Sequence, residues 1–528
     1  MRPTLSSLDG REFDIAIIGA GINGAAAAQA AAASGYRVII IDKGDYGAGS
    51  SARSSRLLHC GLRYLMPGGP ITTWLKHPGR FLDAVKTIKR SMAVRSELVR
   101  GNKAGLKPLR MHYPIFADGP YKPWMVDVAF GILGAVADGK VPLDYKRSSA
   151  AQARAANPFL SFLARPERIA SVASYTEYQF DWPERVVADL VFEAVGLGAT
   201  ARNYTPATSL DFEDNAWTVG LSDAMEGGAA KVRARSVLNL GGAWVDKVNA
   251  LNPPGVARKV TGTKGAHLVF RLPAACRGQG FAAMSSKNRP FYCMPWRDLH
   301  FFGPTETLYE GNLDDVYCDA EDVAFLLGEV NHLFPTLQLG RKDIVSTWAG
   351  IRPLTYDAAL PMGHRSRRIY DMAPEGMPGA FALTNGSLGA HRKTGEDLVA
   401  ALANRLGPAR PQRVGAAGGA TAAGSVAAAG AASAAAAASA ASAPASLAAS
   451  VSAATSARNA DDPLAQHVVT LEDQLARRSG RVWDADLGLD DAAATAARLA
   501  IPLGWSQEKT DAELDAFKRL VEHLYGVH

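Results

Sequence analysis

The stretch FDIAIIGAGINGAAAAQAAAASGYRVIIID, residues 13–42, decides the fold. Its apolar run Ile15–Ile18 predicts a short strand that is buried on both faces. The next residues follow the pattern GxGxxG. In this pattern Gly19 allows a tight turn, Gly21 lets the backbone approach a pyrophosphate, and Gly24 lets a helix pack closely on the strand. The stretch therefore predicts the first strand, turn and helix of a nucleotide-binding unit.

A second strand and an acidic residue complete this unit. Residues 37–41 are rich in β-branched side chains, and Asp42 follows 18 residues after Gly24, which is close to the spacing for a carboxylate that binds a ribose hydroxyl. The Ala-rich helix has no early charge, so its free N–H groups and its dipole would attract a diphosphate. A lone GxGxxG is weak evidence. Here the turn is combined with a strand, a helix, a second strand and an acidic residue at the expected spacing. This combination favours a dinucleotide site over a purely structural glycine turn.

Length and composition narrow the class of protein. The chain has 528 residues, of which 48% are hydrophobic and 20% charged, and this predicts a globular protein with two or three domains. The net charge of +6 favours anionic partners such as phosphorylated metabolites or acidic lipid, and nothing further predicts nucleic-acid binding. The four cysteines are scattered without metal-ligand spacing, so we expect no metal site and a reduced, cytoplasmic location.

Two segments indicate how the domains are connected and whether the protein contacts a membrane. No apolar signal segment precedes the first strand, and residues 414–457 consist almost wholly of Ala, Gly and Ser, which predicts a flexible linker rather than a membrane span. Residues 76–110 contain ten Lys or Arg residues, with apolar side chains at helical spacing, and predict a basic amphipathic helix. Two interpretations stay open for it: a solvated helix packed on the core, or a surface that docks on anionic lipid together with Trp124, Met125 and Phe130.

The segment KGDYGAGSSARSSRLLHCGLRYL, residues 43–65, suits a flavin. A flavin dinucleotide needs small side chains, hydroxyls and backbone groups along its diphosphate and ribityl chain. Its leucines give the segment an apolar face that argues for burial, which would bring His59, Arg63 and Tyr64 inside. Buried basic side chains need an anionic partner, and a substrate phosphate or the flavin would supply one.

Later segments predict the rest of the cofactor site and a second sheet. Residues 201–204, 217–221 and 232–240 are predicted strands, the last of which leads into a second glycine turn at Gly241. Residues 260–270 and 291–303 predict strands of a mixed or antiparallel sheet over the flavin ring. The turn at residues 385–389 precedes an amphipathic helix whose N-terminus would hold the anionic edge of a reduced flavin.

Six separated motifs together resemble the FAD-dependent glycerol-3-phosphate dehydrogenases of the aerobic, quinone-reducing kind. They are GAGINGAAAA, SSARSSRLLHCGLRYL, TGTKGAH, PWRDLHFFGPTET, WAGIRPL and TLEDQLARR. The resemblance implies an α/β fold: a Rossmann-like FAD-binding domain with an antiparallel-sheet substrate domain and a small helical C-terminal cap. The predicted cofactor contacts are Gly19, Gly21, Asn23, Gly24, Asp42, Lys43, Ser50, Ser51, Ser54, Ser55, Arg56, Leu58, His59, Gly241, Gly386 and Leu388.

The predicted domains are interleaved along the chain. The FAD-binding domain takes segments of residues 10–75, 175–250 and 340–408, and the substrate domain takes residues 76–174 and 251–339. Residues 409–460 form the linker and residues 461–528 the cap.

The resemblance also implies roles at the substrate site. Arg63 and Tyr64 match the family's substrate-contacting Arg-Tyr pair, His267 matches its active-site histidine, and Arg352 matches its substrate arginine. This chain departs from the family where Ser387 replaces a lysine expected at the substrate. Gly389 and Ala390 replace threonines near the flavin, and Cys60 replaces a glycine. The missing lysine would weaken substrate binding by about 1.5–3 kcal/mol unless another group compensates.

The sequence thus predicts an FAD-linked dehydrogenase that oxidises the secondary alcohol of a phosphorylated polyol, first of all sn-glycerol 3-phosphate to dihydroxyacetone phosphate. His267 would be the acid-base group, Arg63 and Arg352 would bind phosphate and polarise the oxygen, and Tyr64 would orient the substrate. Ser387 is kept as a candidate substrate contact. Hydride would pass to flavin N5, and the electrons would then reach a quinone.

Partners and competing functions complete the set of expectations. We expect a homodimer that is cytoplasmic, with peripheral attachment to the inner face of the cytoplasmic membrane. Three alternatives stay open: a related polyol-phosphate dehydrogenase, an amine or amino-acid oxidase of the same superfamily, and a catalytically weakened flavoprotein.

Overall fold

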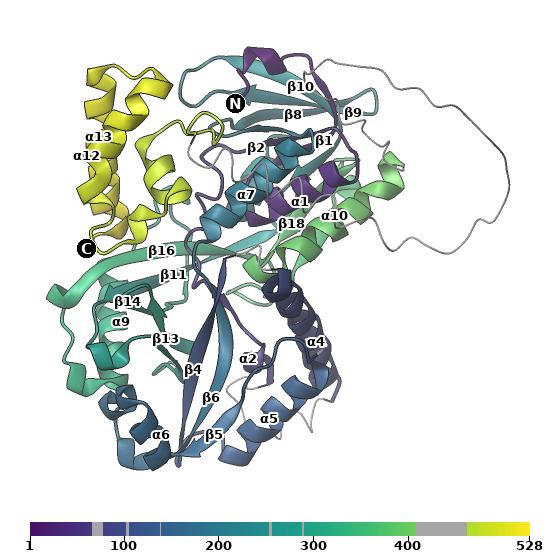
Figure 1. Ribbon diagram of the computed structural model, residues 1–528. Coiled ribbons are helices and arrows are strands. Elements are labelled where there is room, and N and C mark those ends of the chain that lie inside the picture. Colours follow the sequence, from purple (N-terminus) through teal and green to yellow (C-terminus); the bar gives the residue numbers. More distant parts are fainter. Residues whose placement is uncertain (66–77, 102–104, 138, 253–255, 288–289, 408–461) are drawn as a thin grey trace, which may run out of the picture.

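Two sheets and a helical cap organise the chain (Figure 1). The computed structural model describes residues 1–65, 78–101, 105–137, 139–252, 256–287, 290–407 and 462–528. The predicted linker, residues 409–460, lies outside this part of the chain.

The first sheet is the predicted nucleotide-binding sheet. Its path runs β17-β18-β10-β1-β2-β7, with β8 and β9 attached beside β10, and neighbours from β18 to β7 are parallel. The bounds are β1 Glu12–Ile18, β2 Val38–Ile41, β7 Thr200–Arg202, β8 Ala207–Glu213, β9 Ala216–Ser222, β10 Ala229–Asn239, β17 Arg368–Asp371 and β18 Ala380–Thr384. Apolar runs form these strands because both faces are covered: Ile15, Ile17 and Ile40 are fully buried.

Three helices cover one face of this sheet: α1 (Ile22–Ala33), α7 (Pro183–Gly196) and α10 (His391–Leu406). The Ala-rich sequence of α1 lets it lie deep between its neighbours, since Ala25, Ala27, Ala28 and Ala31 are fully buried. The short helix α8 (Val245–Asn249) follows the second glycine turn.

The second sheet is largely antiparallel, which confirms the predicted fold class. Its path runs β15-β11-β14-β13-β12-β4-β6-β3, with β16 beside β11 and β5 beside β6. Among the described strands of this second sheet, only β12 and β4 pair in parallel. The bounds are β3 Leu57–Leu58, β4 Leu106–Phe116, β5 Lys146–Ser149, β6 Ile169–Phe180, β11 Val260–Phe270, β12 Gln279–Met284, β13 Pro290–Trp296, β14 Leu299–Gly303, β15 Thr307–Leu308 and β16 Ile344–Thr355.

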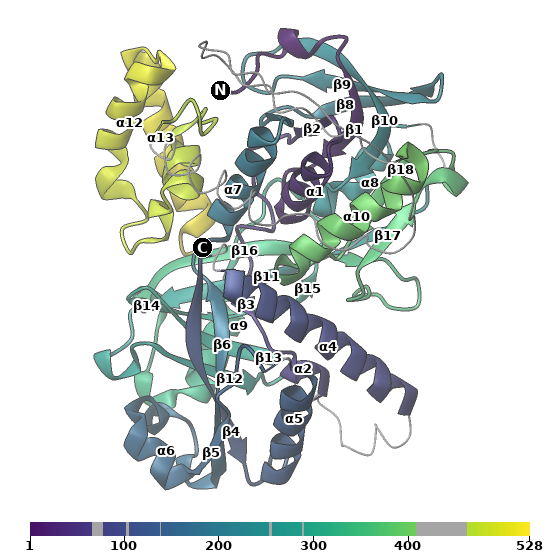
Figure 2. The ribbon, with the colours of Figure 1, turned by 45° about the vertical axis from the view of Figure 1, so that its right-hand side comes forward.

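Helices cover this sheet as well (Figure 2). They are α2 Leu62–Leu65, α4 Pro78–Gly101, α5 Pro123–Val136, α6 Ala150–Ala156 and α9 Ala320–Leu333. The segment bounds of the two domains stay a prediction. Strands β3 and β16, which fall in segments assigned to the FAD-binding domain, hydrogen-bond into the second sheet.

Two local predictions need correction. Residues 291–303 form a hairpin of two strands rather than one strand, because Arg297 adopts a left-handed backbone (φ 54°) and turns the chain. The basic region 76–110 is not one helix: α4 ends at Gly101, and Leu106 begins β4. Ile88 and Met92 of α4 are buried, so its apolar stripe faces the protein. No helix among the described residues is long and apolar enough to cross a membrane.

The cap packs beside α7 and against β16 (Figures 1 and 2). It contains a π-helical turn, Asp473–Arg478, and the helices α12 (Leu489–Leu503) and α13 (Gln507–Tyr525). Its buried residues Trp483, Phe517 and Tyr525 join the same core cluster as Trp348 of β16.

One buried carboxylate ties the cap to the loop after β2. Asp45 is 2% exposed and pairs with Arg477 (Nε–Oδ2 2.6 Å) and with Arg478 (Nη1–Oδ2 2.8 Å and Nη2–Oδ1 2.8 Å). Burial alone would raise the pKa of Asp45, but the two guanidinium groups hold this pKa well below its usual range. The segment TLEDQLARR therefore acts as the anchor of the cap.

Substituting this anchor should destabilise the whole protein. Asp45→Asn leaves the buried Arg478 without its carboxylate partner, whereas Arg477 keeps Glu472 and Asp473, so we expect the free energy of unfolding to fall by about 3–5 kcal/mol. The matched control, Asp118→Asn, breaks the exposed pair with Arg168 (3.1 Å) and should cost less than about 1 kcal/mol. Urea titrations of the two variants measure the difference, and equal losses would contradict the role of the anchor.

Candidate active site

The first of two adjoining cavities lies at the carboxyl ends of β1 and β2 and has a volume of about 630 Å³. This is the edge at which parallel sheets bind nucleotides. The predicted cofactor residues that line it are Gly19, Gly21, Asn23, Asp42, Lys43, Ser50, Ser51, Ser54, Gly241, Gly386 and Leu388. These residues come from four separate segments of the chain, and the fold brings them together.

The glycine turn fits a dinucleotide for steric reasons. Gly19 has φ +104°, and a Cβ there would lie 2.6 Å from the carbonyl oxygen of Leu240. At Gly24 a Cβ would lie 1.8 Å from the carbonyl oxygen of Gly19, so only glycine lets α1 come this close. The turn thus places the N-terminus of α1 at the cavity, where Ser51 Oγ accepts a hydrogen bond from the N–H of Ile22 at 3.0 Å. A diphosphate suits such a site.

Asp42 is held rigidly at this cavity. Its Oδ2 accepts from the backbone N–H of Ala20 (2.6 Å) and its Oδ1 from that of Gly44 (2.9 Å). Burial raises the pKa of Asp42 to about 6, and the two backbone hydrogen bonds oppose the shift. A desolvated carboxyl of this kind is stabilised by further hydroxyl donors, which a ribose supplies.

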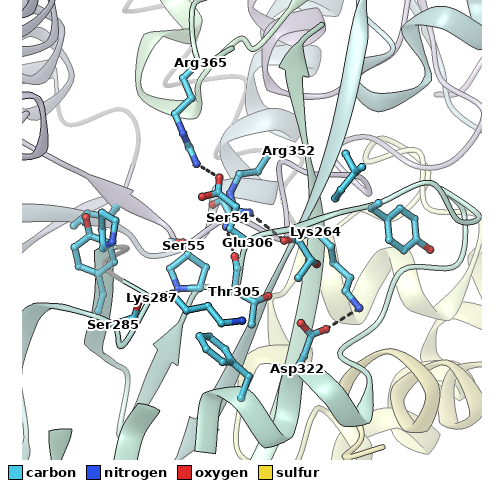
Figure 3. Close-up of a pocket in the computed structure, with 18 of the residues that line it drawn as sticks. Ser54, Ser55, Lys264, Ser285, Lys287, Thr305, Glu306, Asp322, Arg352 and Arg365 are labelled. Atoms are coloured by element: carbon cyan, nitrogen blue, oxygen red, sulfur yellow. Dashed lines mark hydrogen bonds and ion pairs between the residues drawn. The ribbon is translucent and has the colours of Figure 1, made fainter. Parts of the chain in front are cut away.

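The second cavity, of about 1120 Å³, adjoins the first at Ser54 and Leu388, which line both. Its walls come from the segment before α2, from β11 and β16, and from the loops around α9 (Figure 3). Besides Ser54 and Leu388, five more of the predicted site residues line it: Ser55, Arg56, His59, Tyr64 and Arg352.

Cations and carboxylates share this second cavity. Lys264 is neutralised by Asp319 and by Asp322 (Nζ–Oδ2 2.8 Å). Arg352 donates from Nη1 to the carbonyl of Lys264 (3.3 Å) and from Nη2 to that of Thr305 (3.2 Å), which fixes its guanidinium at the wall. Arg365 pairs with Glu306, and Figure 3 shows the two arginines approaching the same region of the cavity. An anionic substrate group fits between them.

His267 lies behind the wall of this cavity rather than on its surface. It is 2% exposed, and its Nε2 lies 2.9 Å from Ser55 Oγ, which does line the cavity. Its ring stacks on Trp348 with centroids 4.7 Å apart, and its Nδ1 has no hydrogen-bond partner among the residues that the structure describes. Burial, reinforced by the charges of Arg352 and Arg56, holds the pKa of His267 well below its usual range. The imidazole is therefore neutral in the free protein.

The remaining predicted residues lie away from the cavities. Gly24 and Leu58 are buried behind the walls, and Ser387 is exposed and lines neither cavity. The side chain of Arg63 is outside the part of the structure that is described, so its role stays a prediction. Among the described residues, no group of three or more His, Cys, Asp or Glu residues is placed to hold a metal ion.

Sequence reasoning missed Arg365 as a site residue. It belongs to the irregular loop between β16 and β17, 13 residues after Arg352, and no motif marks it. Ser55 was predicted as a cofactor contact, whereas the structure places its hydroxyl between the substrate cavity and His267. Only the packing of β11 against the segment before α2 reveals this contact.

Comparison with known proteins gives consistent results. Residues 14–390 match the family model described as FAD dependent oxidoreductase. A glycerol-3-phosphate dehydrogenase of Synechocystis is 26% identical over 413 residues, covering 76% of this chain and 71% of that protein. An aerobic glycerol-3-phosphate dehydrogenase of Staphylococcus aureus is 27% identical over 398 residues, covering 75% and 68%.

Two solved structures share the fold. The glycerol-3-phosphate dehydrogenase of Bacillus halodurans, complexed with FAD, aligns with a TM-score of 0.68 at 18% identity over 98% of this chain and 96% of that one. Glycine oxidase of Geobacillus kaustophilus aligns with a TM-score of 0.52 at 23% identity over 76% and 99%. At these identities the likeness concerns the fold alone.

Proposed function

The chain belongs to the FAD-dependent oxidoreductase family, and on this premise we propose that it oxidises the secondary alcohol of a phosphorylated polyol, first of all sn-glycerol 3-phosphate, to the ketone. One observation carries the proposal: a cavity with two arginines adjoins the cofactor cavity and has the Ser55–His267 pair in its wall. The names of the relatives in Synechocystis and Staphylococcus aureus support the choice of substrate.

Arg352 and Arg365 bind the phosphate in this proposal. Arg352 is oriented by two carbonyl groups, and Arg365 already has an anionic partner in Glu306, which a phosphate would replace. Arg365 thereby takes the place of the family's missing lysine, because Ser387 lies outside the cavity. Charge-assisted hydrogen bonds of this kind contribute about 1.5–3 kcal/mol each.

The Ser55–His267 pair takes the alcohol proton. FAD, when bound, supplies the hydride acceptor, so the protein has to remove the hydroxyl proton as the ketone forms. The substrate hydroxyl donates to Ser55 Oγ, and the Ser55 proton passes to His267 Nε2. The neutral imidazole becomes charged in this step, and it later releases the proton when the product leaves.

We further infer that a quinone at a membrane surface receives the electrons. The relative in Staphylococcus aureus is named an aerobic dehydrogenase. Helix α4 presents exposed basic residues such as Lys86 and Lys89, and Leu82, Trp124 and Val128 of α4 and α5 are exposed apolar side chains. This combination suits a peripheral contact with anionic lipid.

Anaerobic titration of the FAD-loaded protein with a panel of substrates tests the function. We expect sn-glycerol 3-phosphate to bleach the flavin and amino acids to leave it oxidised. In Arg365→Gln the substrate concentration for half-maximal reduction should rise about 10- to 100-fold, because a charged contact is lost. The exposed Arg368, three residues away on β17, gives the control Arg368→Gln, which should match the wild type. Bleaching by amino acids alone would refute the proposal.

The pH dependence of flavin reduction tests the proton path. Because His267 stays neutral where an ordinary histidine gains a proton, the limiting rate should be flat from about pH 8 to 6. A histidine with an ordinary pKa of about 6.5 would lose about fourfold by pH 6. Ser55→Ala should lower the rate by about 100-fold at every pH. A rate that is unchanged in Ser55→Ala would show that the proton does not pass through this hydroxyl.

A further inference from the structure

Arg56 is a fully buried cation directly after Ser55. Its Cζ lies 4.2 Å from the ring centre of Trp296 and 4.3 Å from that of Trp483. Trp296 ends β13, whereas Trp483 belongs to the cap and lies beyond the predicted linker. The cap therefore supplies one of the two indole faces that hold this guanidinium beside the active site.

Glu184, near the start of α7, connects Trp483 and Arg56 a second time. Its Oε1 accepts from Trp483 Nε1 at 2.7 Å and pairs with Arg56 Nη2 at 3.4 Å. Both charged side chains are at most 1% exposed. Burial raises the pKa of Glu184, and Arg56 and the indole N–H oppose the shift. The charge on this carboxylate thus depends on keeping both partners.

The arrangement reaches both members of the Ser55–His267 pair. On the serine side, Arg56 has φ 58°, a left-handed backbone that a residue with a side chain keeps only where its surroundings hold it. Its carbonyl accepts from the N–H of Phe180 at 2.8 Å, so the direction of the neighbouring Ser55 is set as well. On the histidine side, the Trp483 ring lies 5.8 Å from that of Trp348, which stacks on His267.

We propose that Trp483 of the cap is a positioning residue for the Ser55–His267 pair, acting through Glu184 and Arg56 on one side and through the stacked Trp348 on the other. The part that this pair plays in proton transfer rests on the proposed function. The positioning of the pair does not depend on the proposed function, because it is inferred from the contacts that begin at Trp483.

A purely structural role explains this arrangement less well. Apolar side chains of similar volume stabilise a core as well as a buried ion pair does, or better. A charge kept in the interior also acts on its neighbours: burial lowers the pKa of His267, and the charges of Arg352 of β16 and of Arg56 lower it further. The indole N–H of Trp483 donates to Glu184, which pairs with Arg56, and so connects the cap to a cation that acts on the histidine.

The test uses full-length, FAD-loaded protein with 13C-labelled histidine, and His267→Gln assigns the signal. Trp483→Phe keeps an aromatic ring but removes the N–H donor to Glu184. Trp505→Phe is the control, because Trp505 is a partly buried tryptophan of the cap that packs against the same core cluster as the buried Trp483. Arg56→Lys keeps the charge but loses the planar group that packs on the indoles.

In the wild type and in Trp505→Phe we expect the His267 signal not to titrate between about pH 8 and 5. In Trp483→Phe and in Arg56→Lys it should titrate within that range, because the cation is no longer held and water reaches the ring. The limiting rate of flavin reduction should fall about tenfold in both variants, with a half-saturating substrate concentration that changes by less than about twofold.

The proposal is wrong if His267 in Trp483→Phe behaves as in the wild type while the melting temperature falls as it does in Trp505→Phe. If Trp483→Phe does not fold, Arg56→Lys decides by the same titration. Should no polyol phosphate reduce the wild-type flavin, the proposed function fails, and the histidine titration still decides whether the cap positions the pair.

Discussion

The buried carboxylate of Asp45, held by Arg477 and Arg478, is the constraint on which the site depends. The segment that begins there carries Ser50 and Ser51, which line the first cavity, and ends at Ser55 and Arg56, which line the second. The cap holds this segment at both ends, through the two arginines at Asp45 and through Trp483 at Arg56. A single stretch of chain therefore connects the two cavities and the Ser55–His267 pair.

The two cavities differ in their charged and polar groups, and each suits a different ligand. The first offers a helix N-terminus and a desolvated carboxyl, which suit a diphosphate and a ribose. The second has cations in its walls and a neutral histidine behind Ser55. In the proposed function Arg352 attracts the substrate phosphate, and its charge also adds to the burial that keeps His267 neutral.

Local patterns predicted the nucleotide-binding unit well. The observed β1, α1 and β2 follow from an apolar run, a glycine turn and a β-branched run, and β11 has the predicted bounds Val260–Phe270. The hairpin at residues 290–303 was predicted as one strand because its turn uses Arg297 in a left-handed conformation, with no Gly or Asn to signal it. Arg365 and Trp483 escaped prediction because loop packing and cap docking, which leave no periodic signal, bring them to the site.

The central claim is that hydride leaves the alcohol carbon of a phosphorylated polyol as its proton leaves through Ser55. The most direct measurement compares anaerobic flavin reduction by sn-glycerol 3-phosphate and by the same compound with deuterium at C2. The account predicts that both compounds bleach the flavin and that deuterium slows the reaction. A flavin that stays oxidised, or one that both compounds reduce at the same rate in the chemical step, would contradict it.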